Sequence, residues 1–239
     1  MVEKGPTVRQ MTDVTKNAET ANDDITQRYW FHSIRLSDGR ITPGVKSLEL
    51  MEREFALVFD PISLIDRSVL DIGAWNGGFS IEAKRRGANR VVAMDHATWN
   101  NPQLRGRETF DLAVRLCNLD IEAIDQDLDD RKLILDDLGQ FDVVLFLGVF
   151  YHLMNPLAAL REVAARARDV LVVETHIENA LERPYMEFYP DGLNNDKSNY
   201  WGPNRQLIEH LLRRFGFDVI HYSEGSDPVR GVFHAFRCR

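Results

Sequence analysis

Two acidic residues and a group of glycines have types and a spacing that could bind a ligand. Asp71 lies within a short apolar run that is followed by Gly73, Gly77 and Gly78. Glycine tolerates positive φ and lets a ligand approach the main chain without meeting a Cβ. Asp95 follows 24 residues after Asp71, at the end of a second apolar run. We therefore expect a ligand to lie over a strand, turn, helix and strand.

An acid at the end of the second strand is typical of α/β proteins that bind a nucleoside, because its carboxylate accepts hydrogen bonds from the ribose diol. The spacing D-x-G-x-x-x-G-G is not the G-x-G-x-x-G of pyrophosphate binding, so a dinucleotide is the weaker interpretation. An adenosine with a zwitterionic amino-acid tail suits this turn better, since Asp71 stands just before the first glycine. The alternative is a generic strand-to-helix turn with an incidental Asp, which the glycines, both acids and the later strands make less favoured.

A second group of residues could move a proton. Tyr151 and His152 come just after one apolar run, and His176 lies two residues beyond Glu174 at the end of another. Histidine, with an unperturbed pKa of ~6.5, could act as a base near neutral pH. We therefore predict Tyr151, His152 and His176 as catalytic residues. Two alternatives stay open: His152 could serve only to fix Tyr151, and His176 with Glu174 could be a structural pair.

A divalent metal ion is a further candidate. Glu174, His176 and Asp196 offer oxygen and nitrogen donors, and Asn194 and Asn195 precede Asp196. Their spacing is not tight, so the metal remains a secondary expectation.

Alternating helical and extended patterns must position these residues. The expected strands are short apolar runs, and the expected helices carry apolar residues at helical spacing. The patterns predict helices over 48–58, 79–86, 110–116, 157–168 and 204–215, and strands over 68–72, 90–94, 119–124, 141–147, 170–174, 217–222 and 231–236.

The chain is expected to form one domain, 25–239, preceded by a flexible arm, 1–24. The aromatic segment and helix over 25–58 suggest a lid, with an arm packed on the core as the alternative. The long insertion 177–203 is rich in aromatics, Asn and Asp, and a loop of this length inside a compact domain is usually functional or disordered. We interpret it as a cap on the substrate side.

Composition excludes several classes of protein. The 239 residues are 44% hydrophobic and 28% charged, and no apolar run approaches the ~20 residues of a membrane span. The two cysteines do not suggest a disulfide framework, and the sequence MVEKGPTVRQ contains no apolar signal segment, so a cytoplasmic protein is expected. A net charge of −8 weighs against a nucleic-acid partner, because such proteins neutralise phosphates with Lys and Arg.

The glycine-rich turn resembles motif I of the class I S-adenosylmethionine-dependent methyltransferases, with Trp75 where that motif often has a middle glycine. The resemblance covers about residues 60–239 and implies a Rossmann-like α/β fold. In this fold a seven-stranded, mostly parallel sheet has helices on both faces and an antiparallel last strand. It also implies S-adenosylmethionine as cofactor and S-adenosylhomocysteine as product. The cofactor-binding residues it implies are Asp71, Gly73, Ala74, Trp75, Gly77, Asp95, His96, Asp127 (at the adenine amino group), Leu128, Leu147 and Gly148.

A narrower resemblance is carried by LGVFYHLMNPL at 147–157 and NYWGPNRQLIEHLLRRFGF at 199–217, and more loosely by YWFHSI and ITPGVK. These segments resemble the tRNA wobble-uridine methyl- and carboxymethyltransferases and their shorter relatives, some of which resemble sugar O-methyltransferases. In the wobble-uridine enzymes a tyrosine, a lysine and an arginine bind the extra carboxylate of carboxy-S-adenosylmethionine, and Tyr151, Lys46 and Arg230 are the counterparts. The net charge of −8 and the lack of the tRNA enzymes' additional N-terminal portion argue against RNA as the substrate and against the carboxylated cofactor.

The leading prediction is therefore an O-methyltransferase acting on a hydroxyl of a small polar or sugar-like acceptor. The alternatives are a tRNA wobble-uridine modifier and a non-catalytic protein that binds S-adenosylmethionine. We expect no membrane partner, and a homo-oligomer is left open. The residues predicted to meet the acceptor are Trp30, Lys46, Glu174, Tyr189, Asn195, Tyr200, Trp201 and Arg230.

Overall fold

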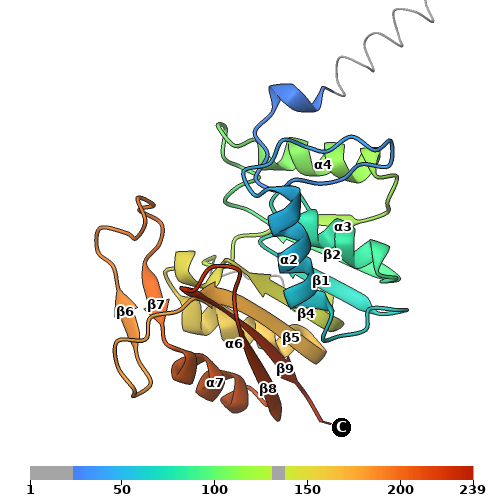
Figure 1. Ribbon diagram of the computed structural model, residues 1–239. Coiled ribbons are helices and arrows are strands. Elements are labelled where there is room, and N and C mark those ends of the chain that lie inside the picture. The colour runs from blue at the N-terminus through green and yellow to red at the C-terminus, as the bar shows by residue number, and fades with distance from the viewer. Residues whose placement is uncertain (1–23, 131–137, 239) are drawn as a thin grey trace, which may run out of the picture.

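A computed structural model describes residues 24–130 and 138–238 of the chain (Figure 1). Its main feature is one seven-stranded sheet, which confirms the predicted fold class. The strands follow the spatial order β3-β2-β1-β4-β5-β9-β8. Their bounds are β1 Ser68–Ile72, β2 Arg90–Asp95, β3 Glu122–Asp125, β4 Phe141–Leu147, β5 Ala167–His176, β8 Val219–Glu224 and β9 Arg230–Phe236.

The strand order reverses at β1, which pairs in parallel with β2 on one side and β4 on the other. Ligands of open α/β sheets bind outside the carboxyl ends of the strands at such a switch point. At the far edge, β9 runs antiparallel to both β5 and β8, as expected for the last strand. The turns after β1, β2 and β4 therefore meet at one edge of the sheet.

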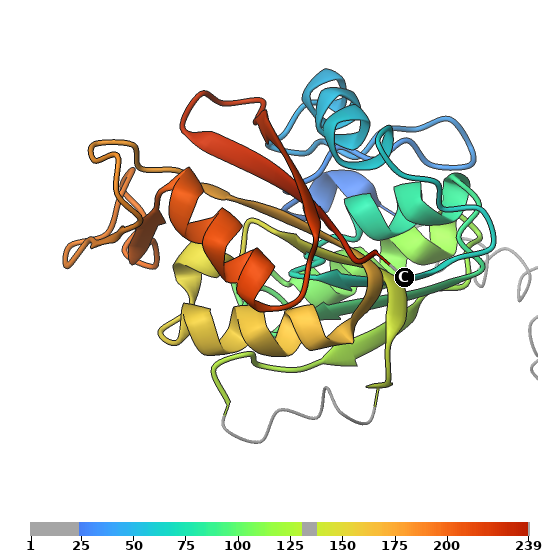
Figure 2. The ribbon, with the colours of Figure 1, turned by 90° about the horizontal axis from the view of Figure 1, so that it is seen from below.

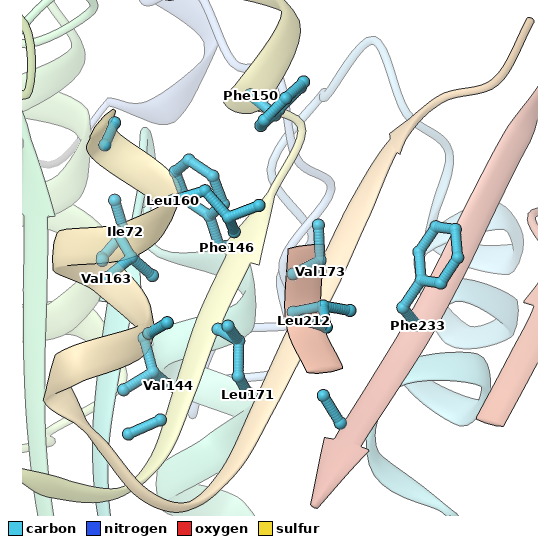
Figure 3. Close-up of a cluster of buried hydrophobic side chains, with 14 of the residues drawn as sticks. Ile72, Val144, Phe146, Phe150, Leu160, Val163, Leu171, Val173, Leu212 and Phe233 are labelled. Carbon is cyan, nitrogen blue, oxygen red and sulfur yellow. The ribbon is translucent and has the colours of Figure 1, made fainter. Parts of the chain in front are cut away.

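Helices cover both faces of the sheet (Figures 1 and 2). Successive residues of the inner strands point to opposite faces, and the two resulting cores are separate. The first core joins Val144 and Leu171 to Leu160 and Leu212 of the helices on that face (Figure 3). Helices α6 Pro156–Arg166 and α7 Arg205–Arg214 lie on that face, and α2 Leu48–Phe59, α3 Gly78–Arg85 and α4 Gly106–Leu116 lie on the other.

Several predicted boundaries differ from the structure. The predicted helix 157–168 ends at Arg166, because Ala167 is already extended and pairs with Phe141 of β4. The third predicted strand, 119–124, is shorter and later: only Glu122–Asp125 pair with β2. The longer β5 also takes in His176, which is its last residue and does not follow the strand as predicted.

The insertion 177–203 contains a small hairpin of its own. Strands β6 Met186–Phe188 and β7 Trp201–Pro203 pair antiparallel in a separate two-stranded sheet, which stands to the side of the main sheet (Figure 1). Asn194 and Asn195 both have positive φ in a tight turn between Leu193 and Asp196. Asn tolerates this left-handed backbone better than most residues. We call residues 177–203 the cap.

The segment before α2 packs against the domain. Ser47 caps α2 by accepting a hydrogen bond from the N–H of Leu50, and Asp24 caps the 3₁₀ turn η1 Ile25–Gln27. Apart from Asp24, the predicted flexible arm lies outside the described residues. Trp30 is 1% exposed among core residues, and its indole N–H donates to the carbonyl of Ile25. The prediction that Trp30 meets the acceptor is therefore wrong.

Within 24–130 and 138–238, no helix has the length and apolar character needed to cross a membrane.

Candidate active site

The turn after β1 is shaped by two glycines and a tryptophan. Gly73 and Gly77 have φ of +81° and +80°, and Trp75 has φ of 47°, which is rare for a residue with a side chain. A Cβ added at Gly73 would lie 2.3 Å from Cγ2 of Val149. Because Val149 follows β4, the turns after β1 and β4 touch, and only glycine fits at their contact.

The N-terminal segment lies on this turn. Phe31 stacks on Trp75 with ring centroids 4.1 Å apart and planes 6° from parallel. The side-chain oxygen of Asn76 accepts the N–H of Phe31 at 2.8 Å. The buried Nε1 of Trp75 has no hydrogen-bond partner among the described residues, so it could donate to a ligand. Asn76 was not singled out from the sequence, where only its place inside the glycine turn marks it.

Asp95 lies at the end of β2 and holds two loops. Its carboxylate accepts the backbone N–H of Trp75 and that of Thr98, both at 3.0 Å. Burial raises the pKa of Asp95, although these donors oppose the rise. Each carboxylate oxygen can accept further hydrogen bonds, so the residue fits a ribose diol while also fixing the turn.

Asp71 supports the turn from inside. It is 2% exposed and accepts a hydrogen bond from the hydroxyl of Ser80, which ties β1 to α3. Burial raises its pKa to about 6, and the charge of Asp95 adds to this rise. At this burial the carboxylate could act on a ligand only through its charge, because little of its surface is open to contact.

The loops after β2 and β3 carry the residues that we expect to lie near the adenine of the cofactor. Asp125 joins them: its carboxylate pairs with Nδ1 of His96 at 2.7 Å and accepts from the amide of Asn100 at 2.8 Å. This hydrogen bond raises the pKa of His96. Asp127 accepts the N–H of Asp129 at 2.9 Å, and the next residue, Leu128, is buried.

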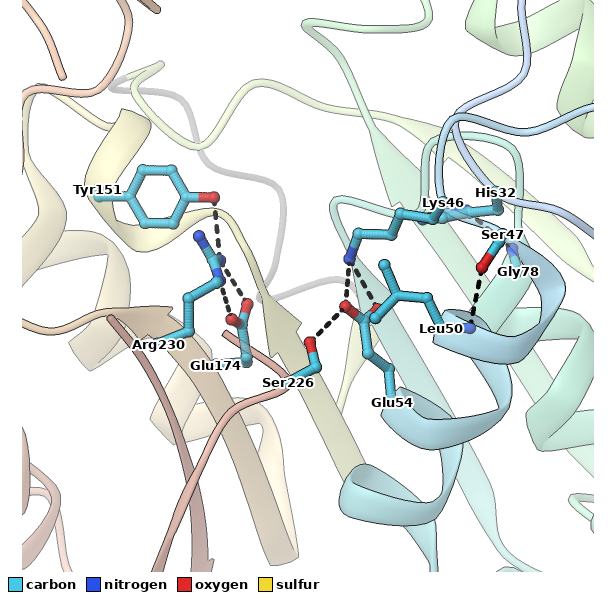
Figure 4. Close-up of polar contacts among 10 residues, drawn as sticks. All are labelled: His32, Lys46, Ser47, Leu50, Glu54, Gly78, Tyr151, Glu174, Ser226 and Arg230. Carbon is cyan, nitrogen blue, oxygen red and sulfur yellow. Dashed lines mark hydrogen bonds and ion pairs between the residues drawn. The ribbon is translucent and has the colours of Figure 1, made fainter. Parts of the chain in front are cut away.

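A polar cluster lies near the carboxyl ends of β4 and β5 (Figure 4). Arg230 donates to both carboxylate oxygens of Glu174, and its Nη2 also donates to Oη of Tyr151 at 3.0 Å. Burial lowers the pKa of Arg230, but Glu174 and Tyr151 raise it by more. Gly148, with φ of +71°, lies beside all three, and its Cβ would be 3.5 Å from Oη of Tyr151. We call Tyr151, Glu174 and Arg230 the arginine cluster.

Lys46 is separate from the arginine cluster. Its Nζ binds both carboxylate oxygens of Glu54, at 2.7 and 2.8 Å, and lies over the ring of Phe31. Ser226 donates to the same carboxylate at 3.1 Å, from the loop that leads into β9 (Figure 4). Of the three residues expected around a ligand carboxylate, the structure therefore brings together Tyr151 and Arg230 and leaves Lys46 paired elsewhere.

His152 is held by the cap. Its Nδ1 donates to the carbonyl of Ser198 at 3.0 Å and also lies 3.0 Å from the hydroxyl of Ser198. Because Nδ1 carries the proton, Nε2 carries the lone pair and can accept one. Burial lowers the pKa of His152, so the imidazole is neutral at pH 7. Ser198 was not predicted as a site residue, since it lies 46 residues away in sequence.

His176 has no carboxylate partner in the described structure. Glu174, predicted to orient it, binds Arg230 instead, so that prediction was wrong. His176 is 9% exposed, and its Nε2 has no hydrogen-bond partner within the described ranges. Its ring packs edge-to-face with that of Tyr189, with the ring centroids 6.1 Å apart. Burial lowers its pKa. His176 thus remains a second candidate base.

The cap is hydrogen-bonded to the residues after β4. The N–H of Tyr200 donates to the carbonyl of Tyr151 at 2.9 Å, and the indole of Trp201 donates to the carbonyl of Leu153 at 2.9 Å. Tyr189 donates its hydroxyl to Glu178 at 3.1 Å. Asn195, by contrast, serves the turn at the hairpin tip. The cap is therefore fixed directly against Tyr151 and Leu153.

The metal prediction is not supported by residues 24–130 and 138–238, which contain no group of three or more His, Cys, Asp or Glu able to hold an ion. Of the three proposed ligands, Glu174 binds Arg230 and Asp196 binds Ser198.

Comparison with known proteins agrees with this geometry. Residues 22–222 match the model of the family described as "Methyltransferase domain". Among curated proteins, the tRNA U34 carboxymethyltransferase of Cellvibrio japonicus (strain Ueda107) is 29% identical over 202 residues, which cover 79% of this chain and 54% of the relative. The tRNA U34 carboxymethyltransferase of Helicobacter pylori (strain G27) is 28% identical over 171 residues, which cover 68% of this chain and 60% of the relative. The chain thus spans about half the length of the curated relatives it matches.

Solved structures share the fold. The N-terminal domain of EvdMO1 with S-adenosylhomocysteine bound has a TM-score of 0.64 at 18% identity, covering 94% of this chain and 97% of that one. Magnesium protoporphyrin IX methyltransferase from Synechocystis PCC 6803 has a TM-score of 0.58 at 18% identity, covering 80% and 83%. With the family model, the switch point at β1 and the glycine turn, the chain belongs to the methyltransferase-domain family, as a class I S-adenosylmethionine-dependent methyltransferase.

Proposed function

We propose that this chain binds S-adenosylmethionine over the carboxyl ends of β1, β2 and β4 and methylates a hydroxyl of a small polar or sugar-like acceptor. The observation that carries the proposal is His152, a neutral imidazole just beyond β4 whose tautomer leaves Nε2 free to accept a proton. A base is needed there because a hydroxyl must lose its proton when it becomes an ether.

The residues around the turn fit the cofactor. Asp95 has the position and the accepting lone pairs for a ribose diol, and Nε1 of Trp75 is a buried donor without a partner among the described residues. The adenine side would be the loop with His96, Asp127 and Leu128. The turn with Gly73, Ala74 and Gly77, with Asp71 behind it, would hold the amino-acid tail, and Leu147 and Gly148 would border the reacting end.

The cofactor supplies a methyl group on a positively charged sulfur. The acceptor oxygen gives its proton to Nε2 of His152 and uses its own electron pair for the bond to the methyl carbon. The electrons of the carbon–sulfur bond would stay on the sulfur of the bound cofactor. The chain contributes by orienting the acceptor, holding the imidazole and covering the site with the cap.

The charges in the site support transfer of a methyl group over a carboxymethyl group. The two cations that the resemblance assigns to a ligand carboxylate are already paired within the chain, Arg230 with Glu174 and Lys46 with Glu54. The overall charge of −8 supports a small acceptor over a nucleic acid. The aromatic side chains of Tyr189, Tyr200 and Trp201 in the cap offer flat surfaces on which a ring could stack.

A second candidate is carboxymethyl transfer to tRNA, as the names of the curated relatives suggest. One observation favours it: Arg230 and Tyr151 are in contact, as that reaction would require. Calorimetric titration with S-adenosylhomocysteine, S-adenosylmethionine and carboxy-S-adenosylmethionine separates the two. We expect the first two to bind and the carboxylated form to bind at least about tenfold more weakly. Preference for the carboxylated form would favour the second candidate, and binding without any turnover would leave a non-catalytic protein.

A further inference from the structure

The tip of the cap carries two polar side chains, Asp196 and Ser198. They lie on the side of the His152 ring that carries Nδ1, away from Nε2. The hydroxyl of Ser198 donates to Oδ1 of Asp196 at 2.6 Å. With its proton committed to Asp196, the Ser198 oxygen can only accept from Nδ1 of His152, 3.0 Å away, so the one N–H of the imidazole is shared between this hydroxyl and the carbonyl of Ser198. The three residues therefore form a one-directional chain of hydrogen bonds from imidazole to hydroxyl to carboxylate.

The sequence of the tip determines this arrangement. Asn194 and Asn195, with φ of 56° and 60°, form a two-residue turn closed by hydrogen bonds between Leu193 and Asp196 in both directions, at 3.1 Å each. Both central residues at positive φ is the pattern of a type I′ turn. Asp196 then accepts the N–H of Ser198 at 2.8 Å as well as its hydroxyl. Turn and carboxylate together fix where Ser198 points.

We propose that Asp196 and Ser198 are positioning residues for His152: they hold the imidazole in the Nδ1–H tautomer and stabilise the charge that it gains when Nε2 takes a proton. The inference rests on the proposed function, in which His152 is the base. The proton on Nε2 comes from the acceptor hydroxyl, and Nδ1 keeps its own, so no proton moves along the chain to Asp196. The arrangement follows the logic of a base oriented by a third group.

The charged groups around His152 agree with this role. Burial lowers its pKa, the backbone hydrogen bond to Ser198 and the charge of Asp196 raise it, and the charge of Arg230 in β9 lowers it. The ring of Tyr151 lies 4.3 Å away, and its phenol is neutral because burial raises its pKa. Asp196 is thus the carboxylate whose charge opposes part of the lowering caused by desolvation and by Arg230. Burial raises the pKa of Asp196, but the hydrogen bonds from Ser198 and the charge of His152 together lower it by more, so the carboxylate stays ionised.

One consequence is that the base is complete only when the cap is in place. The bonds of Tyr200 and Trp201 to the backbone after β4 bring the tip to His152. Closure of the cap over an acceptor and preparation of the base would then be the same event.

The test is a ¹⁵N NMR titration of the histidine side chains in the full chain, with and without S-adenosylhomocysteine. His152→Asn identifies the signal among the seven histidines. We expect the neutral ring to be the Nδ1–H tautomer, and Asp196→Asn and Ser198→Ala to lower the pKa of His152. Ser198→Thr, which keeps the hydroxyl, should restore it. Asp191→Asn, the same change at an exposed position in the cap, is the matched control and should have no effect.

An unchanged pKa of His152 in folded Asp196→Asn and Ser198→Ala, checked by melting temperature, would overturn the inference and leave the two residues as parts of a turn. Methyl transfer from labelled S-adenosylmethionine into a small-molecule extract gives the second measurement. We expect Asp196→Asn to reduce it about tenfold and His152→Asn by about 10² or more. If the pKa shifts as expected but His152→Asn transfers normally, the positioning role stands and the proposed base is wrong.

Discussion

The backbone N–H of Tyr200 lies 2.9 Å from the carbonyl oxygen of Tyr151, so the cap and the strand-end motif are joined through main-chain atoms. The indole of Trp201 repeats the connection one residue later, to the carbonyl of Leu153. Segments that are far apart in the sequence therefore behave as one wall. The cap is anchored at its base and carries a turn, Leu193 to Asp196, that faces His152.

Replacing Trp201 by Phe should loosen the cap and leave cofactor binding unchanged. The change removes one hydrogen bond, worth about 0.5–1.5 kcal/mol. We expect faster hydrogen exchange at the amide of Tyr200 and an unchanged affinity for S-adenosylhomocysteine by calorimetry. The matched control is Trp99→Phe, because the indole of Trp99 donates to the carbonyl of Trp75 in the cofactor turn at 2.8 Å. Trp99→Phe should weaken binding of S-adenosylhomocysteine and leave hydrogen exchange at the amide of Tyr200 as slow as in the parent protein. If both variants gave the same pattern, the cap and the cofactor turn would not be independent.

Replacing Asp71 by Asn should stabilise the ligand-free protein near pH 7.5. The folded pKa, about 6, lies above the ordinary value of 3.8, so the folded state holds a proton that the unfolded state has lost. The contribution of Asp71 to the free energy of unfolding is therefore greatest below about pH 4, and it is lost as the pH rises through about 6. At about 1.4 kcal/mol per pKa unit, ionisation of Asp71 opposes folding by about 3 kcal/mol above pH 6. Asn can still accept from Ser80.

Denaturant unfolding at pH 4 and pH 7.5 measures this difference. The gain in unfolding free energy from Asp71→Asn should be larger at pH 7.5 than at pH 4. Ser80→Ala, which removes the donor to the ionised carboxylate, should be destabilising mainly at the higher pH. If Asp71→Asn were less stable than the parent protein at pH 7.5, the claim that the buried charge of Asp71 opposes folding would be wrong.

Replacing Glu174 by Gln should turn the arginine cluster into an anion site. The carboxylate binds Arg230 through two nitrogens, and removing one partner of such a partly buried pair costs about 3 kcal/mol. We expect a lower melting temperature that sulfate or carboxy-S-adenosylmethionine restores in the variant more than in the parent protein. Glu187→Gln, at an exposed position in β6, controls for the loss of net charge. Equal responses to anions in parent and variant would mean that Glu174 does not neutralise the site.

Much of the sheet could be predicted from the sequence because buried parallel strands are short apolar runs and the glycine turn marks the first of them. The same signals placed Asp95, Tyr151 and His152 at strand ends. The environment of Trp30 was predicted wrongly because the sequence of an aromatic loop fits a lid over the site and a segment packed into the core equally well. The partner of His176 was misjudged because Glu174 is close in sequence, whereas Arg230, which binds it, is 56 residues away. The bond of Ser198 to His152 could not be predicted, since it depends on how a hairpin of three-residue strands docks.

The central claim is that the chain moves a methyl group to a small hydroxyl compound. Incubation with S-adenosylmethionine carrying a trideuterated methyl group, in the presence of both a small-molecule extract and total tRNA, followed by mass spectrometry of each fraction, tests it most directly. The account predicts the trideuteromethyl group as an ether in the small-molecule fraction, strongly reduced with Asp95→Ala and reduced by about 10² or more with His152→Asn. Label in tRNA nucleosides and none in the small-molecule fraction would contradict it.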